Sequence, residues 1–194
     1  SMAVTLTLHV LLSLAFAYCL FSFLEYAVHR FAMHKMRLAN RYGVSFLQRL
    51  CANHMALHHK RDYRHKDHAK DDRIRDVSLA GFVPAMVVIL LLALFDPLAA
   101  RISLGFGVAY GILWWVVHNE MHRSEGRFFS GTAVYRYLER RHQLHHLHPG
   151  TNYGVILPLW DFLLRTSCTP EIQRAAAARQ GSGKEESSPD GPVK

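Results

Sequence analysis

The sequence predicts an all-α integral membrane protein: a helical bundle of about three to four spans with a cytoplasmic histidine-rich helical cap. Three observations lead to this fold, namely long uncharged apolar runs, positive charge confined to the segments between them, and histidines in ordered clusters. The chain has 194 residues, 50% of them hydrophobic, which suits one domain. We expect this domain to cover residues 1–170 and a disordered tail without apolar periodicity to occupy residues 171–194.

Three segments carry no Asp, Glu, Lys or Arg: residues 3–24, 77–95 and 102–117. At 1.5 Å per helical residue the first covers about 33 Å, and the second is also long enough for a hydrocarbon core of about 30 Å. The third is short and needs the residues before it, including a snorkelling Arg101, to reach across. Its Gly-x-x-x-Gly pattern at residues 107–111 permits close approach of another helix.

Positive charge is placed asymmetrically along the chain. Of the 23 Lys and Arg residues, 22 lie between residues 25 and 76 or after residue 117. This positive-inside pattern predicts that both polar segments are cytoplasmic and that the N-terminus is external. The net charge of +8 therefore needs no nucleic acid to explain it, and we expect none as a partner. The pattern includes four arginines for which an anionic headgroup is the alternative role: Arg123, Arg127, Arg140 and Arg141.

Histidine is the unusual residue of this sequence, with 14 copies, and ten of them form four clusters. The clusters are His29 and His34; His54, His58 and His59; His118 and His122; and His142, His145 and His146. Helical positions i and i+4 share a face. His54 with His58, and His118 with His122, can therefore each present two imidazoles on one side of a helix. The fourth cluster also occupies one face. The first pair is five residues apart, about 140° around a helix, which suits two different metals or a distorted helix end.

The number of imidazoles indicates a pair of metal ions. Neutral imidazole binds iron, zinc, copper and nickel, and ten imidazoles exceed what one ion accepts. Two ions with about five nitrogens each is the natural division. The adjacent residues of the pairs His58–His59 and His145–His146 point in different directions, so each pair can serve both ions. The other four histidines are expected to be ordinary surface or core residues: His9, His65, His68 and His148.

A non-catalytic metal-binding or metal-transport membrane protein is the alternative of a different class. A transporter places its ligands near the bilayer midplane, within broken helices. Here the clusters flank the apolar runs, and this favours an enzyme.

The ordered clusters resemble the membrane fatty acid hydroxylase superfamily, which includes fatty acid and sphingolipid hydroxylases, sterol desaturases and carotenoid hydroxylases. The family pattern is H-x4-H, H-x2-3-H-H, H-x3-H and H-x2-H-H, and all four motifs occur here in order. Asn152-Tyr153-Gly154 and the later Pro158-Leu159-Trp160-Asp161 are also typical of its lipid-hydroxylase branch. The resemblance covers about residues 20–166.

This resemblance implies a dimetal, di-iron, O2-dependent oxygenase that hydroxylates an unactivated C–H bond of a lipid. The lipid would be an acyl chain, a sphingolipid, a sterol or a carotenoid, and desaturation or methyl oxidation are alternatives. Carried over by position, the metal ligands would be His29, His34, His54, His58, His59, His118, His122, His142, His145 and His146. Zinc can replace iron in purified protein because histidine sites discriminate poorly by affinity.

Five further residues are candidates to orient the imidazoles from outside the metal centre. They are His148, Asn152, Asp161, Glu25 and Glu120. The sequence contains no haem-attachment motif, no iron–sulfur cysteine set and no nucleotide-binding glycine motif. We therefore expect a separate electron donor, which would be a ferredoxin, a cytochrome or a reductase, and a lipid substrate taken from the bilayer.

Overall fold

The structure is a computed structural model that describes residues 2–60 and 74–175. The helices in chain order are α1 (Met2–Ala27), the π-helix η1 (Val28–Met33), α2 (Met36–Arg41), α3 (Ser45–Asn53), the π-helix η2 (His54–His58), α5 (Ile74–Ala93), α6 (Pro97–Arg123), α7 (Ala133–Leu147) and α8 (Leu159–Leu163). Within the described ranges the chain forms no β-strand, and the predicted all-α fold is confirmed.

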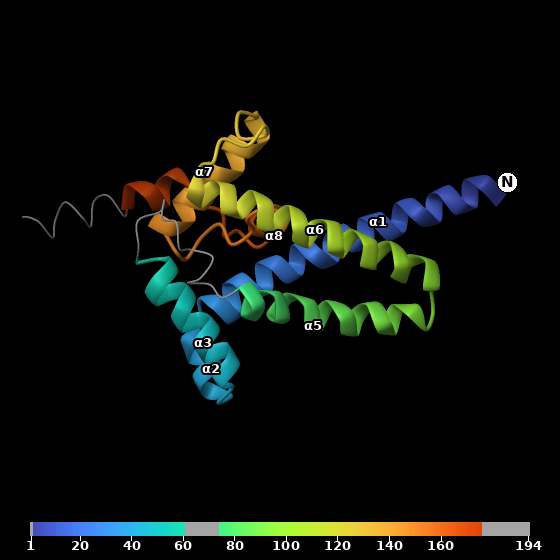
Figure 1. The fold of residues 1–194 in the computed structure, drawn as a ribbon, viewed down its shortest axis with the longest axis horizontal. Helices are drawn as coiled ribbons and strands as arrows, with labels where there is room; N and C mark the ends of the chain where they lie inside the picture. Colours follow the sequence, from blue (N-terminus) through green and yellow to red (C-terminus); the bar gives the residue numbers. More distant parts are fainter. Residues whose placement is uncertain (1, 61–73, 176–194) are drawn as a thin grey trace, which may run out of the picture.

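Three long helices lie side by side and form the body of the molecule (Figure 1). The segments long and apolar enough to cross a membrane are Met2–Met33, Asp76–Ala93 and Pro97–Arg123. Their apolar side chains remain largely exposed, which suits contact with lipid and not with water. The protein is a membrane protein, and the described residues provide three spans of the three to four expected.

The third span is longer than its uncharged run. Helix α6 begins at Pro97, one residue after Asp96, whose side chain accepts a hydrogen bond from the Ala99 backbone N–H. An Asp at the N-cap followed by proline is a strong start signal for a helix. The Asp side chain binds a free backbone N–H, and the N–H that proline lacks would have no partner in the first turn. The helix therefore gains its first turn before Arg101, and the predicted extension is confirmed.

A polar pair connects two spans near the turn between α5 and α6. The His9 Nε2 atom lies 2.6 Å from the Asp96 carboxylate, so α1 is fixed to the turn between α5 and α6. His9 is thus a contact between spans and lies far from the clustered histidines.

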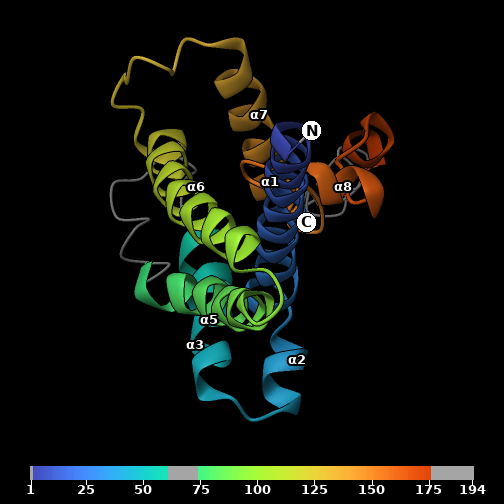
Figure 2. The ribbon, with the colours of Figure 1, turned by 90° about the vertical axis from the view of Figure 1, so that its right-hand side faces the viewer.

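Short helices gather at the other end of the three spans and form the cap (Figures 1 and 2). Helix α7 starts at a Thr132 cap and packs against α6 through a small core that includes Val117, Met121 and Leu138. Helix α8 contacts α1, where the Trp160 indole N–H donates to the Ser22 hydroxyl at 3.0 Å. Residues 170–175 are helical, and the remainder of the predicted tail lies outside the described residues, as do His65 and His68.

Candidate metal centre

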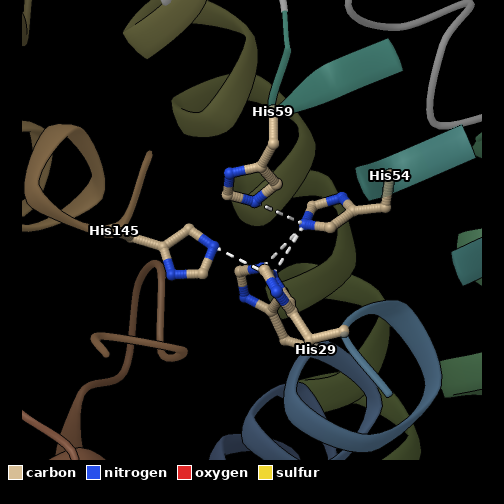
Figure 3. Close-up of side chains that lie close together, drawn as sticks. His29, His54, His59 and His145 are labelled. Carbon is tan, nitrogen blue, oxygen red and sulfur yellow. Dashed lines mark hydrogen bonds between the residues drawn. The ribbon is translucent and has the colours of Figure 1, made fainter. Parts of the chain in front are cut away.

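Five imidazoles from three parts of the chain converge at the junction of the spans and the cap (Figure 3). This first group consists of His29, His34, His54, His59 and His145, and one ring nitrogen from each lies within 4.8 Å of all the others. The side chains come from the end of the first span, from the segment around η2, and from α7. The group is a candidate site for one metal ion.

Two π-helices explain how this first group forms. A π-helix has its hydrogen bonds between residues five apart, so residues i and i+5 share a face. His29 and His34 have this spacing around η1, and their ring centroids are 5.0 Å apart. His54 and His59 have it around η2, where the His59 backbone N–H donates to the His54 carbonyl at 2.9 Å. Of the two sequence-based explanations for the first pair, the distorted helix end is therefore confirmed.

His54 and His58 lie beside each other as their four-residue spacing predicts, with ring centroids 4.9 Å apart, but they belong to different groups. The π-helix turns His54 toward His59 and leaves His58 in the second group. An α-helical spacing rule cannot anticipate this change, because the extra residue per turn rotates the following side chains.

Four buried imidazoles form the second group: His58, His118, His122 and His142. The pair on α6 has ordinary α-helical i, i+4 spacing, and the centroids of its rings lie 4.8 Å apart, as predicted. His146 lies beside this group, with its ring centroid 4.7 Å from that of His58 and 4.8 Å from that of His142. It also lies 4.5 Å from the ring of His59, between the two groups. Nine of the ten clustered histidines therefore form groups of five and four, and the adjacent His58 and His59 are split between them, as the sequence predicts.

The distances within each group fit metal coordination. In the first group the Nε2 atom of His54 lies 3.2 Å from the Nε2 atom of His29 and 3.1 Å from that of His34. In the second group the Nε2 atom of His142 lies 3.1 Å from the Nε2 atom of His118 and 3.0 Å from that of His122. Ligand nitrogens about 2.1 Å from a metal are separated by roughly 3.0–3.4 Å at coordination angles of about 90–110°.

The proton count also points to a cation. The Nδ1 atoms of His29 and His145 lie 2.6 Å from the backbone carbonyls of Tyr153 and Thr151. A carbonyl only accepts, so each Nδ1 must carry the proton and each Nε2 of a neutral ring presents a lone pair. These two lone pairs face the Nε2 atoms of His54 and His34 at 3.2 and 3.1 Å, toward the centre of the group. The arrangement therefore suits a metal ion.

Burial keeps the imidazoles in the form that binds metal. Burial first, and then the neighbouring imidazoles, lowers the pKa of His34 to about 2 and that of His59 to about 4. The same causes hold the pKa of His142 and His145 well below the usual value. These four rings are neutral at physiological pH, as a metal ligand must be.

A loop from the C-terminal motifs holds the two carbonyls in place. Asp161 is fully buried, and its carboxylate accepts from the backbone N–H groups of Tyr153 and Gly154 at 2.9 and 2.7 Å. It also pairs with Arg141 at 3.1 Å. Asp161 therefore orients imidazoles through the loop. Arg141, for which a headgroup or general positive charge was expected, is a buried structural residue.

Asn152 stabilises the same loop from its other side. Its side chain donates to the Arg141 carbonyl at 3.1 Å and accepts from the Cys168 backbone N–H at 2.9 Å. Asn152 has a φ of +52°, a left-handed conformation that asparagine tolerates better than most residues. It supports the chain on either side of the Tyr153 carbonyl.

The carboxylates of Glu25 and Glu120 accept hydrogen bonds from loop residues. Glu25 accepts from the Trp114 indole at 3.0 Å and from the backbone N–H groups of residues 155–157 at 2.8–3.2 Å. Glu120 accepts from the Ser130 hydroxyl at 2.6 Å and from the Gly126 backbone N–H at 3.0 Å, which shapes the α6–α7 connection. His148 ends α7, and its carbonyl accepts from the Thr151 side chain and backbone. The Tyr153 and Thr151 carbonyls had no sequence signal beyond the Asn-Tyr-Gly motif.

Comparison with known proteins agrees with this geometry. The family described as fatty acid hydroxylase matches residues 14–166, which include all ten clustered histidines and the loop that supports them. No curated protein and no solved structure matches the chain. The chain belongs to the fatty acid hydroxylase family, in the membrane fatty acid hydroxylase superfamily.

Proposed function

We propose that the protein is a membrane-bound, O2-dependent dimetal hydroxylase that acts on an unactivated C–H bond of a lipid. The observation that carries the proposal is the pair of adjacent imidazole groups at one end of three apolar helices in a chain of this family. The first group would hold one ion, and the second group together with His146 would hold the other. Iron is the proposed native metal.

When bound, the metal pair supplies an oxidising power that no side chain has. The net reaction inserts one oxygen atom of O2 into the C–H bond, and the other oxygen leaves as water. It consumes two electrons and two protons, which a separate ferredoxin, cytochrome or reductase would deliver. The chain itself contributes neutral, fixed Nε2 atoms and a buried site from which water is largely excluded.

We also propose a topology for this reaction. The distribution of Lys and Arg supports a cytoplasmic cap and an external N-terminus. A metal centre at the junction of spans and cap would accept a lipid directly from the bilayer and electrons from the cytoplasm. Nucleic acid has no place in this reaction.

Metal analysis and lipid mass spectrometry test the proposal together. Purified protein should contain close to two metal ions per chain, in part zinc, and reconstitution with iron under reducing conditions should give the active form. With O2 and an electron donor, one lipid class of the host membrane should gain one oxygen atom. His145→Ala should abolish this product, whereas His65→Ala should retain it. Metal-free protein from metal-replete cells, or equal product from both variants, would contradict the proposal.

A further inference from the structure

A cavity of about 400 Å³ begins at the metal centre and extends between the three spans. His29, His54 and His118 line one end of it. Beyond them its walls are mainly apolar and come from α1, α5 and α6. The two histidine groups thus share a single space that leads into the membrane-spanning part of the protein.

The length of this space fits an extended hydrocarbon chain. Its lining on α6 extends from His118 to Leu104, 14 residues or about 21 Å of helix. Mainly apolar side chains from three helices line this length, so burial of methylene groups along it is favourable.

Two glycines provide room in the middle of the cavity. Gly81 on α5 and Gly111 on α6 are separated from the α5–α6 turn by a similar number of residues. They therefore line the cavity at a similar distance from that turn. A Cβ atom built on either would meet nothing within 4 Å. Gly107 differs, because a Cβ there would collide with the Phe21 ring, so this glycine serves helix packing. Helical glycine costs about 1 kcal/mol relative to alanine, and packing does not explain that cost at Gly81 and Gly111.

The cavity opens sideways between α5 and α6. Phe82, Val108 and Ile112 line it and yet are 58%, 58% and 62% exposed. In a membrane this exposed surface faces lipid tails. A lipid chain can therefore reach the cavity from the bilayer without crossing water.

We infer that the cavity binds a single extended hydrocarbon chain, which enters between α5 and α6, and that Gly81 and Gly111 determine how long a chain is accepted. This inference rests on the proposed function and narrows its substrate class to lipids with one extended chain in the cavity. The reacting carbon lies at the cap end of that chain, beside His29, His54 and His118. The remainder of the chain passes the two glycines toward the middle of the membrane.

Substitution of the glycines gives the turnover test, with iron-loaded protein in phosphatidylcholine nanodiscs and acyl substrates of graded length plus a sterol. In Gly111→Leu or Gly81→Leu, the ratio of kcat/KM for short over long chains should rise by at least about 10-fold, the usual effect of a filled apolar pocket. Gly105→Leu is the matched control: it lies on the same helix as Gly111, has open space around it and does not line the cavity. Its chain-length profile should equal that of the wild type. The same profile in all variants, or preference for the sterol, would overturn the inference.

A binding measurement separates this inference from the proposed reaction. Trp114 and Trp115 line the cavity, whereas Trp160 lies against Ser22 and Phe23. Dibrominated palmitic acid should quench the fluorescence of zinc-loaded wild type and Gly105→Leu saturably, and Gly111→Leu at least about 10-fold more weakly. Equal quenching of all three proteins overturns the chain site. Normal quenching with no hydroxylated product from any lipid overturns the proposed function and leaves the chain site standing.

Discussion

His29 and His34 lie five residues apart on a π-helix, as do His54 and His59, whereas His118 and His122 lie four residues apart on α6. The first group thus takes four of its five rings from the two π-helical segments, whereas the second group takes only His58 from one of them and its other rings from regular α-helices. The second group is buried throughout, whereas His34 and His59 of the first group are half-buried. The two groups therefore have different support: the regular helix α6 presents its pair by itself, whereas two rings of the first group also contact a separate loop.

The supporting contacts differ accordingly. Asp161 and Glu25 bind backbone N–H groups of residues 153–157, and the carbonyls at Thr151 and Tyr153 hold two rings of the first group. Glu120 binds the connection between α6 and α7, the two helices that carry three of the four rings of the second group. Damage to the loop should therefore affect the first group selectively, and each prediction below tests this difference.

The largest effects are expected from removing one ligand of each group. His54→Ala and His142→Ala should each lower the metal content from about two ions to about one, and product formation should fall more than about 100-fold, beyond the loss typical of outer contacts. Elemental analysis with a product assay checks this. Gln143→Ala, next to His142 on α7, should keep both ions. If either ligand variant loses both ions, the two groups are one cooperative site and the comparison fails.

Asp161→Asn should have the next largest effect. It leaves Arg141 buried beside a neutral side chain, and breaking such a pair costs about 3–5 kcal/mol of unfolding free energy. The loop then loosens, so the affinity of the first group for metal should fall about 10–100-fold while the second group keeps its ion. Denaturation and chelator competition measure the two quantities.

An exposed ion pair provides the control for Asp161→Asn. Glu171 and Arg174 lie 3.1 Å apart but are 72% and 75% exposed, so Glu171→Gln should cost less than about 1 kcal/mol. Equal metal loss from both groups in Asp161→Asn would show that the loop does not support the first group selectively.

Gly154→Ala should produce a smaller loss. A Cβ there would lie 2.8 Å from the Leu157 carbonyl oxygen and 2.9 Å from the Pro158 Cα, and these backbone atoms can move little. Overpacking of this kind costs about 1–3 kcal/mol, measured as a lower thermal midpoint. Gly150→Ala, where a Cβ meets nothing within 4 Å, should leave the midpoint unchanged. If Gly154→Ala also loses more metal from the first group than from the second, the loop supports the first group selectively.

Much of the site could be predicted from residue type and spacing. The pair on α6 follows from four-residue spacing, and the division of His58 from His59 follows from the different directions of adjacent residues on a helix. Spacing did not show which group His54 joins, because helix type at η2 depends on contacts that no local pattern encodes. Gly111 differs from prediction in a similar way: the Gly-x-x-x-Gly pattern is used for packing at Gly107 and borders the cavity at Gly111.

The sequence by itself determined the three apolar spans, the all-α class and the ordered histidine clusters, because these depend on composition and periodicity. Only the tertiary structure decided which histidines come together, which carbonyls fix their protons and where the apolar cavity lies. These properties depend on contacts between residues as distant as His29 and Tyr153, which are 124 positions apart. Such contacts arise from packing of the whole chain, and no local pattern determines them.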